Sequence, residues 1–236
     1  MKCNGDEIKS ALMRIYKINP NDFIAYQVCL QTRDPFKVLI ATILSQNTSD
    51  KLAFKAYNEL EKRIKVSPET LANATIDEIK EAIKGAGLYN SKSIKIKHVA
   101  EVICREYDCN LANLVKRGKD LEQIRELLLS LEGVGEKTAD VVLLTCYGLP
   151  FFPADTHIKR VSKRLGLVKE NASYSEISEA LKKLFAPDDF LLMHHLLILH
   201  GRTTCKARKP LCNTCVLSYC CEYYSRIYRN ERSNTT

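Results

Sequence analysis

The sequence predicts an all-α fold, because helix signals recur along its length while signals for strands are nearly absent. Apolar residues return at helical spacing in many segments. Residues that favour a helix start stand directly before those segments, as in Asp34-Pro35 and in the capping box Thr75-x-x-Glu78. No internal repeat, low-complexity segment or obvious linker interrupts the pattern. Many short helices are therefore expected.

These signals place the helices one after another along the chain. A polar interruption at 45–49 separates the first two helices, and Gly85-Ala86-Gly87 ends the fourth. A second capping box, Ser173-x-x-Glu176, opens a later one. The expected helices span 36–44, 50–64, a short stretch from Pro68, 79–84, 90–107, 121–131, a stretch from about Glu136, one behind Asp155, 177–185 and one from Phe190.

The stretch from Leu131 to Ala139 joins two of these helices and carries the first candidate site. Gly133-Val134-Gly135 is expected to form a tight turn, because glycine adopts positive φ without a Cβ clash. Val134 can fold back between the two helices. The first N–H groups of the second helix lack intrahelical partners, so they form an anion site that suits phosphate.

Lys137 lies in the first turn of that second helix. Because a cation is disfavoured at the positive end of a helix dipole, Lys137 is expected to lose its proton more readily than a surface lysine. A neutral amine is a nucleophile. An ordinary corner between two helices with an exposed lysine explains these nine residues equally well.

Composition limits the class of protein. With 236 residues, of which 45% are hydrophobic, the chain can form one or two globular domains with real cores. The net charge of +8 favours a polyanionic partner without proving one. The N-terminus lacks the apolar stretch of a signal peptide, and the apolar run at 190–199 is too short to span a bilayer. A soluble cytoplasmic protein without membrane contact is expected.

Four cysteines near the end of the sequence indicate a metal centre. Cys205, Cys212, Cys215 and Cys221 are separated by six, two and five residues, and four thiolates in one loop can close around an iron–sulfur cluster. Zinc is the alternative, although zinc sites usually bring two close pairs of cysteines. Cys220 competes as the fourth ligand. The other cysteines are scattered and are expected to be small core or surface residues: Cys3, Cys29, Cys104, Cys109 and Cys146.

Two further stretches have both structural and functional interpretations. Asp155 is expected to cap a helix, and its carboxylate could instead face Lys137 across a cleft. Gln46-Asn47 follows an apolar helix, and Leu88-Tyr89 lies on a glycine-flanked loop. Such side chains suit insertion into a stack of bases, but ordinary loops explain them as well.

Taken together, these stretches resemble the endonuclease III family of helix-hairpin-helix DNA glycosylases. The matching segments occur in the family's order and cover the chain from about Pro35 to Cys221: 44–50, 87–92, 131–143, 155–161, 197–201 and the cysteine loop. One segment departs from the family. Many members have Ser-Ala-Gln-Ala-Thr where this chain has Ser45-Gln46-Asn47-Thr48-Ser49, so the amide that acts there is left open.

The resemblance implies a two-domain helix-hairpin-helix DNA glycosylase fold with its active site in the cleft between the domains. Residues 28–149 would form a six-helix domain that carries the hairpin. Residues 1–27 and 150–236 would form a discontinuous domain that carries a [4Fe-4S] cluster on Cys205, Cys212, Cys215 and Cys221.

The resemblance also implies a bifunctional glycosylase and abasic-site lyase of base excision repair. Lys137 falls on the family's nucleophile and Asp155 on its catalytic carboxylate. The partner would be double-stranded DNA with a damaged base, with oxidised pyrimidines as the expected class, or with an abasic site. The enzyme would act as a monomer in the cytoplasm, bound to the nucleoid. The implied DNA contacts are Gln46, Asn47, Leu88, Tyr89, Gly133, Val134, Gly135, Lys206, Arg208 and Lys209.

Two alternatives share parts of this pattern. Relatives that remove mispaired thymine, uracil or adenine carry the same cluster and hairpin, but most lack a lysine at the position of Lys137 and do not cut the strand. A non-catalytic iron–sulfur protein that binds DNA or transfers electrons is the alternative from another class. The preferred lesion and the opposite base are not defined by the sequence.

Overall fold

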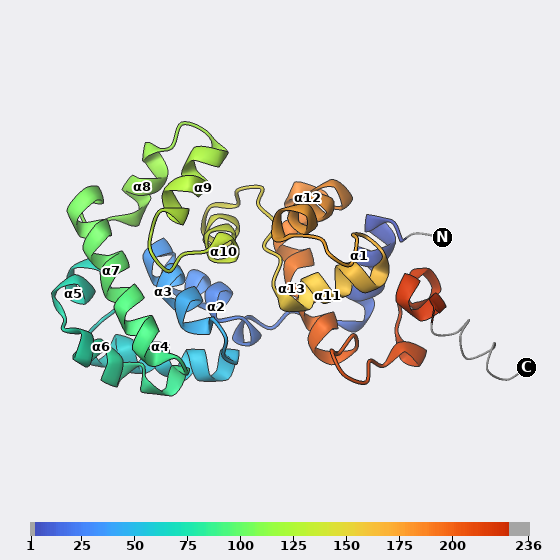
Figure 1. The fold of residues 1–236 in the computed structure, drawn as a ribbon, viewed down its shortest axis with the longest axis horizontal. Coiled ribbons are helices and arrows are strands. Elements are labelled where there is room, and N and C mark those ends of the chain that lie inside the picture. Colours follow the sequence, from blue (N-terminus) through green and yellow to red (C-terminus); the bar gives the residue numbers. More distant parts are fainter. Residues whose placement is uncertain (1–2, 227–236) are drawn as a thin grey trace, which may run out of the picture. The chain divides into compact units, whose positions relative to one another are not determined.

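The computed structural model describes residues 3–226, and every regular element in this range is helical (Figure 1). Residues 19–149 contain α2 (Ile24–Thr32), α3 (Pro35–Ser45), α4 (Asp50–Arg63), α5 (Pro68–Asn73), α6 (Ile76–Ala82), α7 (Tyr89–Tyr107), α8 (Leu111–Arg117), α9 (Leu121–Leu129) and α10 (Glu136–Tyr147). The remaining described residues contain α1 (Gly5–Ile15), α11 (Thr156–Leu165), α12 (Tyr174–Leu184) and α13 (Phe190–Thr203). Short 3₁₀ turns lie at Pro20–Asp22, Lys84–Ala86, Pro187–Asp189, Cys212–Thr214 and Ser218–Cys220.

The helices form two compact units. Residues 19–149 make the first, which we call the hairpin unit, and the described residues before 19 and after 149 make the second, the cysteine unit. These units divide the chain at 18/19 and at 149/150, whereas the domains predicted from the sequence divide it at 27/28 and at 149/150. The reason is packing, because α2 contacts α3 and α10 of the hairpin unit.

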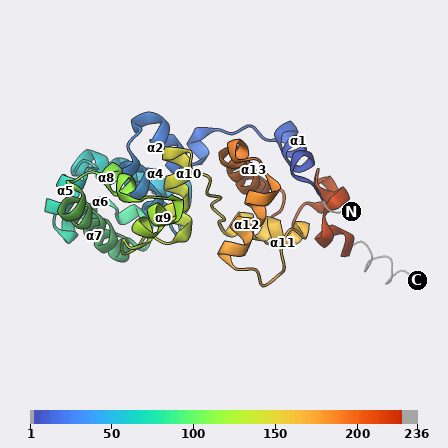
Figure 2. The ribbon, with the colours of Figure 1, turned by 90° about the horizontal axis from the view of Figure 1, so that it is seen from above.

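The hairpin unit is arranged around α3 and α7. Residues 38–44 of α3 are all buried, which explains why this helix reads as a continuous apolar run, and α3 contacts α2, α4, α7 and α10. α7 contacts α5, α6 and α8, as Figure 2 also shows. Six helices of the unit have 9 to 19 residues, and α5, α6 and α8 have six or seven.

Side-chain caps fix several helix starts as the sequence predicts. The Asp34 carboxylate accepts hydrogen bonds from the N–H groups of Phe36 and Lys37 at the start of α3. Complete capping boxes open α6, at Thr75 and Glu78, and α12. Because these caps act within one helical turn, local sequence is sufficient to predict them.

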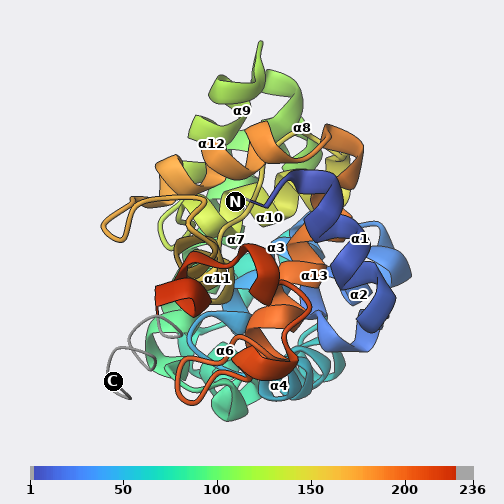
Figure 3. The same ribbon diagram turned by 90° about the vertical axis from the view of Figure 1, so that its right-hand side faces the viewer.

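The cysteine unit joins both ends of the described chain. α1 contacts α13, and α13 contacts α11, as Figure 3 shows from the side of this unit. The ring of Phe152 stacks on Phe185 and meets Phe190 edge to face. The ammonium of Lys9 lies 2.6 Å from the Asp189 carboxylate and ties α1 to the turn before α13. Among the described residues, no helix is long and apolar enough to cross a membrane.

Candidate functional site

In the turn between α9 and α10, the first glycine has a positive φ and the second does not. Gly133 has φ +91°, and a Cβ added there would lie 2.7 Å from side-chain carbons of Lys95, so both conformation and space require glycine. Gly135 has φ −91° in extended backbone, and an added Cβ would meet no atom within 4 Å. The expectation that both glycines serve the turn is therefore wrong for Gly135. Val134 is buried, as predicted, and its N–H donates to Leu131.

The start of α10 has the features of an anion site. Gly135 is the N-cap, and no side chain caps the first turn. The N–H groups of Thr138 and Ala139 donate to the Gly135 carbonyl. Lys137 is half-buried in this turn, beside the open space in front of Gly135. The helix dipole and its first N–H groups therefore favour a phosphate here.

A buried ion pair joins the two helices of the hairpin. The Arg125 guanidinium of α9 lies 2.7 Å from the carboxylate of Asp140 in α10, whose side chain is 1% exposed. Arg125 also reaches the exposed Glu136 at 3.2 Å. Since Glu136 and Asp140 flank Lys137 on α10, this arginine fixes the helix that carries the candidate nucleophile.

The two amides after α3 have different surroundings. The Gln46 amide nitrogen donates to the Gly133 carbonyl and to the Thr138 hydroxyl, both at 3.2 Å. Asn47 is exposed and has φ +52°, in the left-handed region that asparagine tolerates better than most residues. Gln46 is therefore engaged with the hairpin, while the side chain of Asn47 is accessible to a ligand.

The Leu88 loop lies beside the segment of Asn47. Leu88 has φ +50° and is 59% exposed, although it is a large apolar side chain, and Tyr89 is half-buried. A Cβ added at Gly87 would lie 4.0 Å from the Thr48 hydroxyl oxygen. The structure thus brings together the two loops that the sequence singled out, each with one exposed residue in left-handed backbone.

Asp155 caps α11 as predicted. Its Oδ1 accepts a hydrogen bond of 2.8 Å from the Ile158 N–H, and the residue is half-buried. Asp155 belongs to the cysteine unit, and Lys137 belongs to the hairpin unit. The cap alone is a sufficient structural reason for an aspartate here, so a catalytic role stays a prediction.

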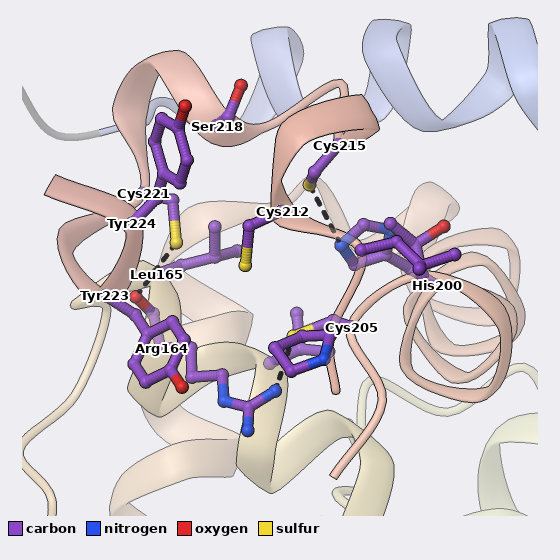
Figure 4. Close-up of a pocket in the computed structure, with 14 residues that line it drawn as sticks. Arg164, Leu165, His200, Cys205, Cys212, Cys215, Ser218, Cys221, Tyr223 and Tyr224 are labelled. Atoms are coloured by element: carbon purple, nitrogen blue, oxygen red, sulfur yellow. Dashed lines mark hydrogen bonds between the residues drawn. The ribbon is translucent and has the colours of Figure 1, made fainter. Parts of the chain in front are cut away.

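The four predicted cysteine ligands line one pocket of the cysteine unit. The sulfurs of Cys205, Cys212, Cys215 and Cys221 face the interior of this pocket (Figure 4), which also has Arg164, Leu165 and His200 in its walls. All four are free thiols. Within the described part of the chain, no three Cys, His, Asp or Glu side chains converge on one point as ligands of a single ion would. Four sulfurs around a pocket suit a centre of several metal atoms better than a zinc ion.

The electrostatics of the pocket call for a cationic occupant. Burial, together with the neighbouring cysteines, raises the pKa of the Cys215 thiol to about 11, against a backbone hydrogen bond from Leu217. Burial also raises the pKa of Cys212 and of Cys221. Thiolates are the ligand form, so four of them are stable together only around positive charge. The residues present therefore fit an iron–sulfur cluster.

The structure pairs four of the other cysteines in disulfides. Cys3 is bonded to Cys220, and Cys104 is bonded to Cys109. Cys3 is buried, as expected of a small core residue, but Cys3, Cys104 and Cys109 each have a disulfide partner that the sequence did not predict. Cys220 also ceases to compete as the fourth ligand, since its sulfur is bonded to Cys3, whereas the neighbouring Cys221 has a free thiol in the pocket.

The basic loop after Cys205 is held by an arginine of α11. Arg164 donates to the carbonyls of Lys206 and Ala207 and, at 3.4 Å, to the Cys205 sulfur. Its guanidinium also lies 4.6 Å from the centre of the Tyr223 ring. The side chains of Lys206, Arg208 and Lys209 are exposed, so their charges are available to a polyanion.

Three residues with site contacts have no role predicted from the sequence, although two of them lie in the matching segments 87–92 and 197–201. Arg164 is one, and His200 is another, with its Nε2 3.7 Å from the Cys215 sulfur and its Nδ1 3.2 Å from the Tyr16 hydroxyl. The third is Lys92, which is 2% exposed. Burial, aided by Lys95, lowers the pKa of Lys92 to about 8. A signal for Lys92 exists, because it shares the helical periodicity of the buried residues Ile96, Val99 and Ile103.

Comparison with known proteins agrees with this architecture. Residues 40–187 match the HhH-GPD superfamily base excision DNA repair protein. The chain is 44% identical over 227 residues to endonuclease III of Sulfolobus acidocaldarius, which covers 96% of this chain and 99% of that protein. A trapped endonuclease III–DNA covalent intermediate has a similar structure, with a TM-score of 0.78, 29% identity and coverage of 96% of this chain and 99% of that one.

A thermostable thymine-DNA glycosylase is also similar, with a TM-score of 0.76, 24% identity and coverage of 94% of each chain, a likeness that shows the fold alone.

The all-α fold, the glycine turn and the start of α10 together define a helix-hairpin-helix protein. The chain belongs to the HhH-GPD superfamily of base excision DNA repair proteins. The resemblance found in the sequence and the fold class that it implies are thereby confirmed.

Proposed function

We propose that this protein is a bifunctional DNA glycosylase and abasic-site lyase of the endonuclease III type. It removes a damaged base from duplex DNA and then cuts the strand on the 3′ side of the resulting site. The observation that carries the proposal is Lys137, which lies in the first turn of α10 directly after the Gly133–Gly135 turn. The protein's membership of the HhH-GPD superfamily and its 44% identity to an endonuclease III support the same activity.

The chemistry follows from the amine. A base inside a duplex is out of reach, so the nucleotide is first flipped out of the helix. The Lys137 amine attacks C1′ of the deoxyribose and displaces the base, and the opened sugar becomes a Schiff base on the same nitrogen. Loss of a C2′ proton then allows β-elimination, which breaks the bond to the 3′ phosphate. The structurally similar endonuclease III was trapped as a covalent intermediate with DNA, which supports an adduct of this kind.

Asp155 is the proposed carboxylate of this reaction. It would stabilise the positive charge that develops on the sugar as the base leaves and help to move the lysine's proton. The hydrogen bond from Ile158 uses one of its oxygens, and a carboxylate can accept several hydrogen bonds. The capping role and the catalytic role are therefore compatible in one side chain.

The remaining contacts would hold and open the DNA. Phosphate would bind at the hairpin turn and at the start of α10, with Lys206, Arg208 and Lys209 adding positive charge. Leu88 would act as the wedge in the opposite strand, beside Tyr89. The geometry favours Asn47 over Gln46 as the amide that fills the vacated position, because the Gln46 amide is engaged with Gly133 and Thr138. Oxidised pyrimidines are the proposed lesions, and the enzyme would act as a monomer in the compartment that holds the chromosome.

A [4Fe-4S] cluster is the proposed cofactor, held by Cys205, Cys212, Cys215 and Cys221. When bound, it would supply structural cross-linking of the cysteine loop, and no redox step in base removal is needed. The chain's own residues then position the basic loop, since Arg164 and Arg160 donate to backbone carbonyls of residues 205–207. The four sulfurs that face one shared pocket support this ligand set.

Borohydride trapping tests the function directly. Reduction of the Schiff base should fix a covalent enzyme–DNA adduct for the wild type and none for Lys137→Gln. The variant should still bind an abasic duplex within about tenfold, or about 1.4 kcal/mol, because backbone N–H groups and not the amine hold the phosphate. A variant that cuts at the wild-type rate would place the nucleophile elsewhere. Excision without any adduct would favour the mismatch glycosylase alternative.

A further inference from the structure

Lys92 is buried in the hairpin unit, where a lysine is not needed for packing. It lies near the start of α7, is 2% exposed, and its ammonium donates to two backbone carbonyls, Leu44 at 2.8 Å and Ala86 at 2.9 Å. The bond to Leu44 spans 48 positions of the sequence, and the bond to Ala86 spans six. An ammonium that satisfies terminal helix carbonyls is a favourable arrangement, which explains why this charge is tolerated inside the unit.

The two carbonyls belong to the two loops that flank the proposed DNA site. Leu44 lies in the last turn of α3, three residues before Asn47, and Ala86 ends the 3₁₀ turn two residues before Leu88. The Lys92 side chain thus holds the backbone at the start of both loops at a fixed spacing. The approach of Gly87 to Thr48 places the loops themselves next to each other.

Gln46 connects the Asn47 segment to the hairpin turn. Its amide donates to Gly133 and Thr138, on either side of Gly135. From α7, the stem of Lys95 packs against Gly133 so closely that a Cβ there would collide with it. The Asn47 segment, the Leu88 loop and the phosphate-binding turn are therefore joined by direct contacts within one unit.

The exposed tips of both loops need such support. Asn47 and Leu88 have φ values of +52° and +50°, and left-handed backbone is unfavourable for a residue that has a Cβ. Such conformations persist only where the surroundings hold them. The side-chain hydrogen bonds of Lys92 and Gln46 connect these segments to one another.

We propose that Lys92 and Gln46 are positioning residues that lock the Asn47 segment, the Leu88 loop and the hairpin turn into one rigid DNA-opening surface. Extrusion of bases from the duplex depends on them, and the chemistry at Lys137 does not. This inference rests on the proposed glycosylase and lyase function. It assigns a role to two residues that touch neither the sugar nor the leaving base.

Lys92→Met is the first test, with Lys97→Met as its matched control. Lys97 lies on the same helix and also donates to two carbonyls, Ala72 and Ala74, both at 2.9 Å, but these lie at the end of α5. Both variants lose two charged hydrogen bonds, and Lys97→Met also loses an ion pair with Glu101 at 3.0 Å. Melting temperatures report the structural effect of each variant. Only Lys92→Met should change the readouts that depend on the loops.

Two readouts separate base extrusion from chemistry. The first is the fluorescence rise of 2-aminopurine placed opposite a tetrahydrofuran abasic analogue in a duplex, which needs no reaction. The second is single-turnover excision from a duplex, compared with borohydride trapping on an abasic site in single-stranded DNA. Lys92→Met should lose most of the fluorescence rise and slow excision at least about tenfold, while single-strand trapping stays within about threefold. Lys97→Met should match the wild type in all three.

Gln46→Met keeps the test decisive even if Lys92→Met does not fold. Gln46 is only partly buried. Gln123→Met, on α9, is its control, because the Gln123 side chain accepts from the Lys119 N–H, outside the three segments. Gln46→Met should show the same split between duplex excision and single-strand trapping, and Gln123→Met should not. The inference is overturned if Gln46→Met and any folded Lys92→Met behave like their controls. A wild type that neither excises nor traps would instead overturn the proposed function.

Discussion

Asp155 shows how one residue can satisfy a structural and a chemical requirement together. Asparagine caps helices about as well as aspartate and has the same size, so Asp155→Asn removes only the negative charge. The melting temperature should stay near that of the wild type, because the bond to Ile158 survives. Excision of a damaged pyrimidine should fall by about two orders of magnitude or more, while cleavage of a preformed abasic site suffers less.

The same substitution at another cap is the control for Asp155. Asp120 caps α9 by accepting from the Gln123 N–H at 2.9 Å, and it lies on the exposed side of its helix. Asp120→Asn should leave both stability and excision unchanged. An Asp155→Asn enzyme that excises at the wild-type rate would reduce Asp155 to its capping role.

His195 should make the protein sensitive to acid. Burial, with His194 and Arg202 nearby, lowers its pKa from 6.5 to about 2, so the unfolded chain binds a proton that the folded chain refuses. Stability is then lost as the pH falls below 6.5, by about 1.4 kcal/mol per pH unit. In urea titrations between pH 7 and 4, His195→Gln should flatten this slope. His98→Gln, at a side chain that is 40% exposed, should keep it.

At the level of elements, the hairpin depends on the ion pair between α9 and α10. Arg125→Met leaves the Asp140 carboxylate buried without its guanidinium, which should lower the free energy of unfolding by about 3–5 kcal/mol. Glu136→Gln removes the exposed partner of the same arginine and should change it by less than about 1 kcal/mol. Urea unfolding at 25 °C measures both. Equal changes in the free energy of unfolding for the two variants would mean that Arg125 does not stabilise the buried Asp140 carboxylate.

At the level of the whole molecule, the cysteine loop decides whether the cofactor is present. Purified protein should be yellow-brown with broad visible absorbance and should contain iron and sulfide. Cys221→Ser should lose the colour and the iron, because its sulfur faces the pocket, whereas Cys220→Ser should keep them, because its sulfur is bonded to Cys3. Colourless protein with stoichiometric zinc, or the reverse result for the two variants, would contradict this ligand set.

The predictable parts of this molecule are those fixed by neighbouring residues. The caps at Asp34, Thr75 and Asp155 act within one turn, and the four cysteine ligands lie in a single segment, so their pattern is visible in the sequence. The Cys3–Cys220 bond spans 217 positions and leaves no local trace.

The place of α2 and the burial of Lys92 both depend on packing between segments that are separate in the sequence. The assignment of α2 to the hairpin unit depends on its packing against α3 and α10, which no local pattern specifies. The burial of Lys92 depends on carbonyls that two other segments supply, although its position on the buried face of α7 was readable. Because lysine is rarely buried, its residue type argues against a buried position for Lys92, although the helical periodicity favours one.

The Cys3–Cys220 bond closes nearly the whole polypeptide into a covalent ring, with the hairpin unit as an arc of that ring. A protease that nicks the chain once between residues 19 and 149 opens the ring without releasing a fragment. Such a molecule migrates as one species on a denaturing gel without reductant and as two with it. Both pieces of a nicked enzyme therefore stay tethered and can refold together.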